Sequence, residues 1–88
     1  MLETIKLALR ISHDKLDAEL LRLIETAKAE LIRAGVPEET IAKNGSLITQ
    51  AVTTYCLMNL TDDIRLIDHY QKAFEIQVDS IRRSSNVQ

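Results

Sequence analysis

The sequence predicts an all-α fold, a small single-domain helical bundle of about four helices with an extra turn in the middle connector. Apolar residues recur every three or four positions in four separate segments, which is the periodicity of amphipathic helices. Only one proline and two glycines interrupt the 88 residues, and only three residues are aromatic. A chain of this length buries about 60–65% of its unfolded surface, so we expect one modest core of aliphatic side chains.

The first two helices are predicted from their apolar stripes and their boundaries. A short helix over residues 2–9 is expected to depend on packing against the rest of the chain. The second helix should follow a cap at Ser12 or Asp14 and end at Gly35, which suits the left-handed conformation that closes many helices. Its predicted core face carries Leu16, Leu20, Leu23, Ile24, Ala27, Leu31 and Ala34.

The connector after the second helix is expected to hold the extra turn. Pro37 followed by Glu38 and Glu39 is typical of a first helical turn, because acidic side chains stabilise the positive end of the helix dipole. Asn44 and Gly45 are residue types that favour loops, and we expect them to separate this turn from the next helix.

The third helix is predicted to begin with Ser46 as its cap and to end near Leu60. Asp62 and Asp63 break the pattern there and are suited to capping the helix that follows. The predicted apolar face of the third helix consists of Leu47, Ile48, Ala51, Val52, Tyr55 and Met58.

The fourth helix is predicted to start at Ile64 or Leu66 and to end at Ile81. Its apolar stripe is formed by Ile67, Tyr70, Phe74, Val78 and Ile81. The helical domain is therefore expected to cover residues 1–83, with residues 84–88 as a flexible tail.

Charge, cysteine content and hydropathy argue against several classes of protein. Eleven basic and thirteen acidic residues leave a net charge of −2 and are mixed along the chain. Nucleic-acid-binding domains usually show clustered positive charge, which is missing here. The lone cysteine, Cys56, cannot form an internal disulfide, and this favours a reducing compartment. No segment approaches the roughly 20 apolar residues of a membrane span, so no membrane association is expected.

No catalytic, cofactor or metal site is predicted. His13 and His69 lack partners at the spacing that metal sites need. Cys56 borders the apolar face of the third helix, where a lone cysteine is usually a small buried hydrophobe. The chain is therefore expected not to be an enzyme and to require no cofactor.

Four apolar residues fall off the predicted core stripes. At about 100° per residue, Leu21 and Ile32 share a second face of their helix. Leu57 and Ile76 lie roughly opposite the core positions of the third and fourth helices by the same rule. These four residues are the candidate contacts for self-association or for docking to another protein.

Several stretches of the chain, taken in order, match a known family. They are residues 5–11 with Asp14 and Asp17, residues 17–30 with 34–39, residues 46–52 with Tyr55, and residues 70–75. Together they resemble the helices of the small head–tail connector proteins of tailed phages, also called DNA-packaging or head-completion proteins.

The resemblance implies a phage or prophage protein that assembles as a ring of about a dozen copies beneath the portal protein. Such a ring would extend the DNA channel without sequence-specific binding and would offer a platform to the tail or a further head-completion protein. It would lie at the head–tail junction of the virion, after synthesis in the bacterial host cytoplasm. Leu21, Ile32, Leu57 and Ile76 become candidate subunit contacts, and Pro37, Glu38, Glu39 and Asn44 become candidates for docking to the portal or tail.

Two other classes of function stay open from the sequence. A small helical adaptor or regulator that binds another protein would share the helical fold and the slightly acidic composition. A helix-turn-helix DNA-binding regulator is also built from short helices, although no helix of this chain is basic.

Overall fold

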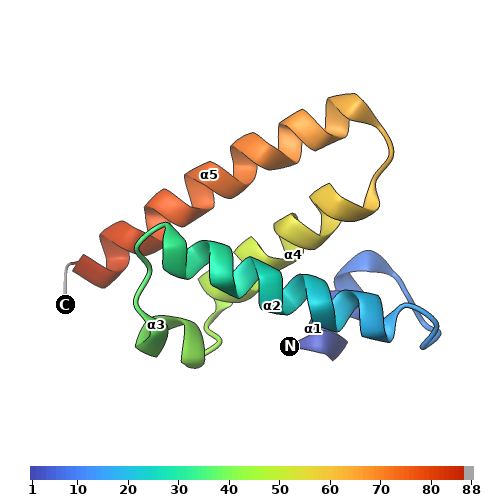
Figure 1. Ribbon diagram of the computed structural model, residues 1–88, viewed down its shortest axis with the longest axis horizontal. Helices are drawn as coiled ribbons and strands as arrows, with labels where there is room; N and C mark the ends of the chain where they lie inside the picture. The colour runs from blue at the N-terminus through green and yellow to red at the C-terminus, as the bar shows by residue number, and fades with distance from the viewer. Residues whose placement is uncertain (87–88) are drawn as a thin grey trace.

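The computed structural model describes residues 1–86 and shows five α-helices and no strand in that range. The helices are α1 (Leu2–Leu9), α2 (Asp17–Arg33), α3 (Glu38–Ala42), α4 (Ser46–Leu60) and α5 (Ile64–Asn86). The predicted all-α class is confirmed, and α3 is the extra turn that was predicted in the connector. Helices α4 and α5 form an antiparallel hairpin, and α2 crosses one end of it (Figure 1).

Helix α4 is the centre of the fold. No charged residue occurs between Lys43 and Asp62, so the whole helix lacks formal charge. It packs against α1, α2 and α5. Its buried residues are spread around the helix axis and comprise Ile48, Ala51, Val52, Thr54 and Cys56. A helix that is covered on several sides has no single apolar stripe, and this explains why the predicted face of α4 was only partly right.

Two residues that were predicted on the core faces of α2 and α4 are exposed. Leu47 lies in the first turn of α4, and Leu16 immediately precedes α2, so both lie at helix ends. Conversely, Cys56 and Thr54 are buried although only the first was expected near the core. The Thr54 hydroxyl donates to the backbone carbonyl of Gln50 at 3.0 Å, which satisfies its polar group inside the protein.

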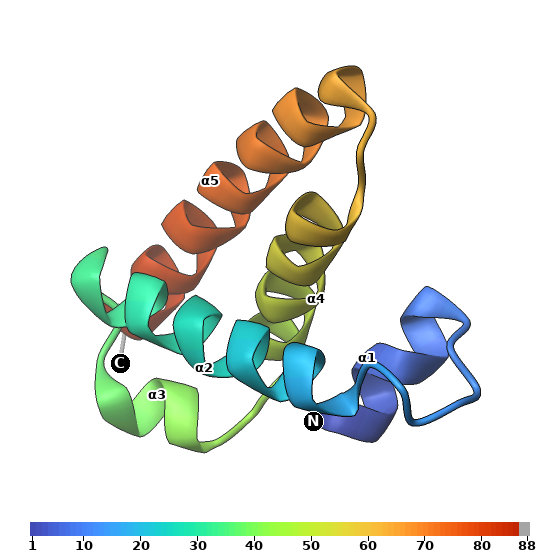
Figure 2. The same cartoon turned by 45° about the vertical axis from the view of Figure 1, so that its right-hand side comes forward.

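The hydrophobic core lies where α1, α2, α4 and the second half of α5 meet. Its buried members are Ile5, Leu20, Leu23, Ile24, Ala27, Leu31, Val36, Ile41, Ile48, Ala51, Val52, Cys56, Val78 and Ile81. The predicted stripe of α5 is buried only toward its C-terminal end, because Ile67 is 37% exposed. The first turns of α5 and the end of α4 project beyond α2 (Figure 2).

An ion pair fastens the short helix α1 to α2. Lys6 Nζ lies 2.8 Å from Asp17 Oδ1, and the Lys6 side chain is largely buried. The hydrogen bond to Asp17 raises the pKa of Lys6 above its ordinary value of 10.5. Since the folded protein favours the ammonium form, this stabilisation is present at neutral pH and is lost as the pH rises through the raised pKa.

Helix α2 ends as predicted, in a Schellman motif at Gly35. The Gly35 N–H donates to the Ile32 carbonyl and the Val36 N–H donates to the Leu31 carbonyl, each at 3.0 Å. Gly35 has a φ of +103°, which residues with a side chain rarely adopt. The chain therefore reverses sharply, buries Val36 and leads into α3.

Two predicted helix caps are wrong. Helix α2 begins at Asp17, and neither Ser12 nor Asp14 caps it with a side chain. The backbone carbonyl of Asp14 instead accepts the Asp17 N–H at 3.2 Å, so a turn precedes the helix. In α4, Ser46 is already the first helical residue, with Gly45 before it. The Ser46 side chain is therefore one position too late to act as the cap.

The start of α5 agrees with the predicted capping, and its end lies later than predicted. Asp63 Oδ1 accepts the backbone N–H of Arg65 at 2.9 Å, and Thr61 Oγ1 accepts the Asp63 N–H at 3.2 Å. The helix continues through residue 86, so residues 84–86 of the predicted tail are helical. Residues 87 and 88 of that tail lie outside the described part of the chain.

Replacement of Gly35 by alanine should lower the free energy of unfolding by about 1–2 kcal/mol, because a side chain there would be strained. The added Cβ would also lie 3.4 Å from Arg82 Nε. Gly45→Ala is the matched control, since its φ is −65° and no atom lies within 4 Å of the added Cβ. Urea denaturation of both variants checks this, and equal losses of stability would contradict the assigned role of Gly35.

Candidate interaction surfaces

The histidines and the cysteine that were considered as catalytic or metal-binding residues make local contacts or are buried. His13 Nδ1 accepts the backbone N–H of Lys15 at 3.3 Å, and the His69 ring packs edge-on against its neighbour Tyr70. Cys56 is fully buried. In the part of the chain that the structure describes, no three His, Cys, Asp or Glu side chains are grouped to hold a metal ion. Within residues 1–86, no helix has the length and apolar character of a membrane span.

An apolar groove lies at the projecting end of the α4–α5 hairpin, and we call it the tip groove. It is lined by Leu9, Ile11, Leu16, Leu57, Leu60, Thr61 and Tyr70. None of these side chains carries a formal charge, and all but Thr61 present mainly apolar surface. Ile64 and Ile67 are exposed on the same end of the hairpin. Contiguous exposed apolar surface of this kind is typical of protein-binding sites.

The tip groove depends on segments that are far apart in the sequence. Leu9 and Ile11 come from the end of α1 and the loop after it, and both pack partly against the core. Leu57, which was predicted as a subunit contact, is half-buried in this groove rather than fully exposed opposite the core. The end of α4 and the first turns of α5 project beyond α2 (Figures 1 and 2), and α2 meets the groove only at its N-cap, Leu16. The groove is therefore left open.

A second groove runs between α2 and α3, and we call it the α2–α3 groove. Its lining residues are Glu25, Lys28, Ala29, Ile32, Glu38, Ile41 and Ala42. Ile32 is 44% exposed, and Ile41 is buried beneath. Lys28 Nζ lies 3.9 Å from Glu25, so the basic residue is partly neutralised within the groove. The groove thus combines apolar side chains with an acidic rim.

The structure brings together two residues that the sequence had assigned to different roles. Ile32, a predicted subunit contact, and Glu38, a predicted docking residue, line the same groove. Pro37 and Glu39 are exposed beside it at the start of α3. Asn44 is not part of this group. It has a φ of +48°, ends the turn after α3 and lines a separate groove of uncharged polar residues beside α4.

A third surface is the side of α5 that points away from α4, which we call the outer face of α5. Ile76 is 68% exposed at its centre. Lys72 and Arg83 lie on the same side of the helix and form exposed ion pairs with Asp68 at 3.2 Å and Asp79 at 2.9 Å. Ile76 is therefore an isolated apolar side chain with basic residues on both sides along the helix.

The fourth predicted contact, Leu21, is half exposed on the same side of α2 as Ile32 but is not among the residues lining the α2–α3 groove. Leu21 lies eleven residues before Ile32, which is three helical turns, so the two positions share one side of the helix. The predicted second stripe of α2 is thus accessible at both of its positions.

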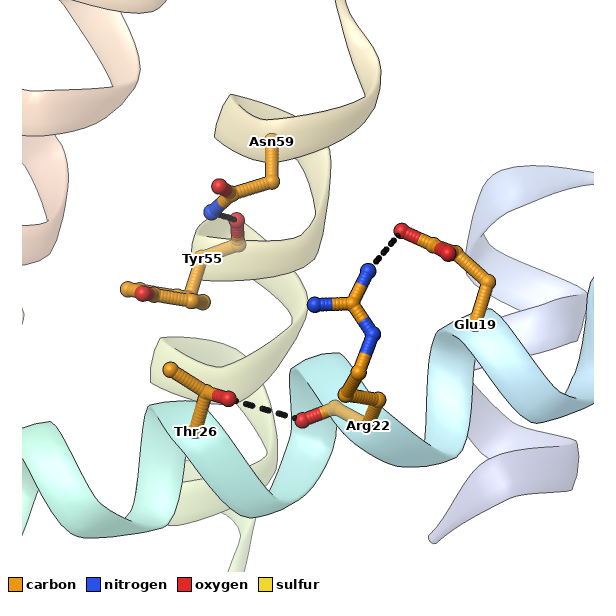
Figure 3. A network of polar contacts seen from close by, with 5 residues as sticks. All are labelled: Glu19, Arg22, Thr26, Tyr55 and Asn59. Carbon is orange, nitrogen blue, oxygen red and sulfur yellow. Dashed lines mark hydrogen bonds and ion pairs between the residues drawn. The ribbon is translucent and has the colours of Figure 1, made fainter.

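The polar side of α2 near α4 is occupied by contacts within single helices. Figure 3 shows Arg22 paired with Glu19 and the Thr26 hydroxyl donating to the Arg22 carbonyl at 2.9 Å. In α4, the Asn59 amide donates to the Tyr55 carbonyl at 2.9 Å. Because these polar groups already have partners, this side is a weaker candidate for binding than the tip groove, the α2–α3 groove and the outer face of α5.

Cys56 should resist thiol reagents in the folded protein and react fully after unfolding in urea. Burial raises the pKa of its thiol from the ordinary value of 9.0 to about 11. The folded state therefore keeps the proton to higher pH, and the free energy of unfolding should fall as the pH rises from about 9 toward 11. Immediate reaction of the native protein at about pH 8 would contradict this environment, since only the thiolate attacks such reagents.

Comparison with known proteins identifies the family of this chain. A family model described as phage connector protein matches residues 1–85. No curated protein and no solved structure matches the sequence. The match spans all five helices, so the resemblance to head–tail connectors that the sequence suggested is confirmed. The chain belongs to the phage connector protein family.

Proposed function

We propose that this protein is the head–tail connector of a phage or prophage. As a member of the connector family it is a structural protein of the phage particle. In the proposed role it assembles as a ring under the portal protein, extends the DNA channel and provides a docking surface for the tail. The observation that carries the proposal is the presence of two apolar grooves and one exposed aliphatic side chain, Ile76, at separate places on one small domain.

The number and positions of these surfaces suit a ring subunit. Each copy in a ring contacts its two neighbours through two different surfaces, because the contact is repeated head to tail. A connector needs a third surface for the protein above or below it. The α2–α3 groove and the outer face of α5 supply the first two surfaces, and the tip groove supplies the third.

The tip groove is the best candidate for the contact with the portal or the tail. It has no charged side chain, and its apolar residues come from four parts of the chain. Burial of apolar surface contributes about 25 cal/mol per Å², so a partner that covers this groove gains binding energy without having to desolvate a charge. In this proposal Leu57 contacts that partner rather than a neighbouring subunit.

The charges of the chain support passage of DNA rather than its capture. Capture requires several Lys or Arg contacts with phosphates, whereas this chain has a net charge of −2. The helix-turn-helix alternative is disfavoured for the same reason. Helix α3 has only five residues and carries Glu38 and Glu39 in its first turn, which would repel phosphate groups.

Light scattering over a concentration series, with and without purified portal protein, tests this function. A large assembly, formed alone or only with the portal, is the expected result. A monomer that is indifferent to the portal at every concentration would contradict the connector role and would favour the adaptor class instead.

Leu60→Gln should weaken the complex with the portal or the tail protein about tenfold or more, because Leu60 lines the tip groove. Leu47→Gln is the matched control, since Leu47 lies at the other end of α4 and is similarly exposed, at 42% against 38% for Leu60. Binding titrations by calorimetry or light scattering measure the difference. Equal affinities of the two variants for both partners would exclude the tip groove as the contact.

A further inference from the structure

The proposed ring requires each copy to present two surfaces that fit each other, and the structure offers such a pair. We infer that the α2–α3 groove of one copy binds the outer face of α5 of a second copy, with Ile76 seated against Ile32. This inference rests on the proposed connector function and specifies how its subunits meet. Four properties of the two surfaces support it, namely shape, apolar character, charge and position.

The α2–α3 groove can accept a branched aliphatic side chain. Ala29 and Ala42 are small residues on its two walls, one from each helix, and Ile32 is exposed between them. Ile41 is buried below and closes the floor against the core. An aliphatic side chain that entered from outside would therefore contact apolar side chains from both helices.

The outer face of α5 presents such a side chain. Ile76 is 68% exposed and points away from the core stripe of its helix. Lys72 lies one turn before it and Arg83 two turns after it on the same side, about 6 Å and 10 Å away along the axis, with Asp79, the ion-pair partner of Arg83, between Ile76 and Arg83. A single exposed aliphatic residue between basic residues is the expected complement of an apolar groove with an acidic rim.

The charges of the two surfaces are complementary. The rim of the groove carries Glu25 and Glu38, and only Lys28 among its lining residues is basic. Lys72 and Arg83 form exposed ion pairs within α5. Exposed ion pairs of this kind contribute little to stability, so their basic groups can exchange partners at low cost. Complementary charges of this kind fix the orientation of two chains and disfavour wrong pairings.

The two surfaces lie on different helices, the groove on α2 and α3 and the other surface on α5. When the groove of one copy binds the outer face of a second copy, the groove of the second copy stays free, so the same contact can repeat from copy to copy. It therefore produces either a ring or a filament, and the first is what a connector requires. The tip groove has no charged lining residue and takes no part in this contact, so it remains free to bind another protein.

Charge reversal tests this contact. Glu38→Lys places two basic side chains together at the contact with Lys72 of the next copy, and Lys72→Glu places two acidic side chains together there. Each variant alone should therefore assemble about tenfold or more weakly. A 1:1 mixture of the two variants should assemble like the natural protein, because each contact in an alternating ring then joins one acidic and one basic residue. Light scattering under the conditions in which the natural protein assembles measures all three samples.

Two further variants separate the apolar contact from the charges. Ile76→Gln should impair assembly, while Leu7→Gln, a similarly exposed position on α1, should leave it unchanged. Circular dichroism should show that every variant is folded, because all four positions are exposed.

The outcomes distinguish this inference from the proposed function. If the natural protein assembles and both charge reversals assemble equally well, or if the mixture fails to recover, the contact is wrong and the connector function stands. If Glu38→Lys assembles normally but loses binding to the portal, the groove holds that partner instead, and the inference is overturned. If the natural protein never assembles, alone or with the portal, both are wrong.

Discussion

The rest of the structure depends on the burial of an uncharged helix, α4, among three other helices. Its lack of charge from residue 44 to residue 61 lets it be covered on several sides without the cost of burying an ion. The hydroxyl groups of Thr53 and Thr54 are satisfied within the helix, by the Thr49 carbonyl at 2.7 Å and the Gln50 carbonyl at 3.0 Å. Because α1, α2 and α5 each turn their main apolar stripe toward α4, only the apolar residues that lie off those stripes or beyond the packed region face outward.

The same arrangement explains why the tip is uncovered. A domain of this size buries only a modest fraction of its surface on folding. Helix α2 covers only one end of the α4–α5 hairpin, so the other end stays exposed. The rings of Tyr55 and Phe74, 5.5 Å apart, mark where the two helices of the hairpin still pack closely. Beyond them the apolar residues of both helices become progressively exposed. A protein that functions within an assembly can leave such surface to its partners, as the connector family implies.

Features that depend on neighbouring residues could be predicted from this sequence, whereas features that depend on contacts between distant helices could not. The end of α2 was predictable because Gly35 and Pro37 act within a few residues. The faces of α4 were not, because the side that is buried depends on how many helices surround it. The joining of Ile32 and Glu38 in one groove was also hidden, since it requires α3 to fold back along α2. The tip groove left one signal in the sequence, the long uncharged segment that contains Leu57, but that segment does not reveal which of its ends is uncovered.

Amide hydrogen exchange, with and without purified portal protein, tests the central claim that a stable α4 core carries an open, partner-binding tip. Amides of residues 48–56 should exchange most slowly in both samples, since local stability follows burial. Residues 57–70 should exchange faster in the free protein and become protected when the portal, or a tail protein in its place, is bound. Slow exchange at the tip of the free protein, or protection that appears only on the polar side of α2, would contradict it.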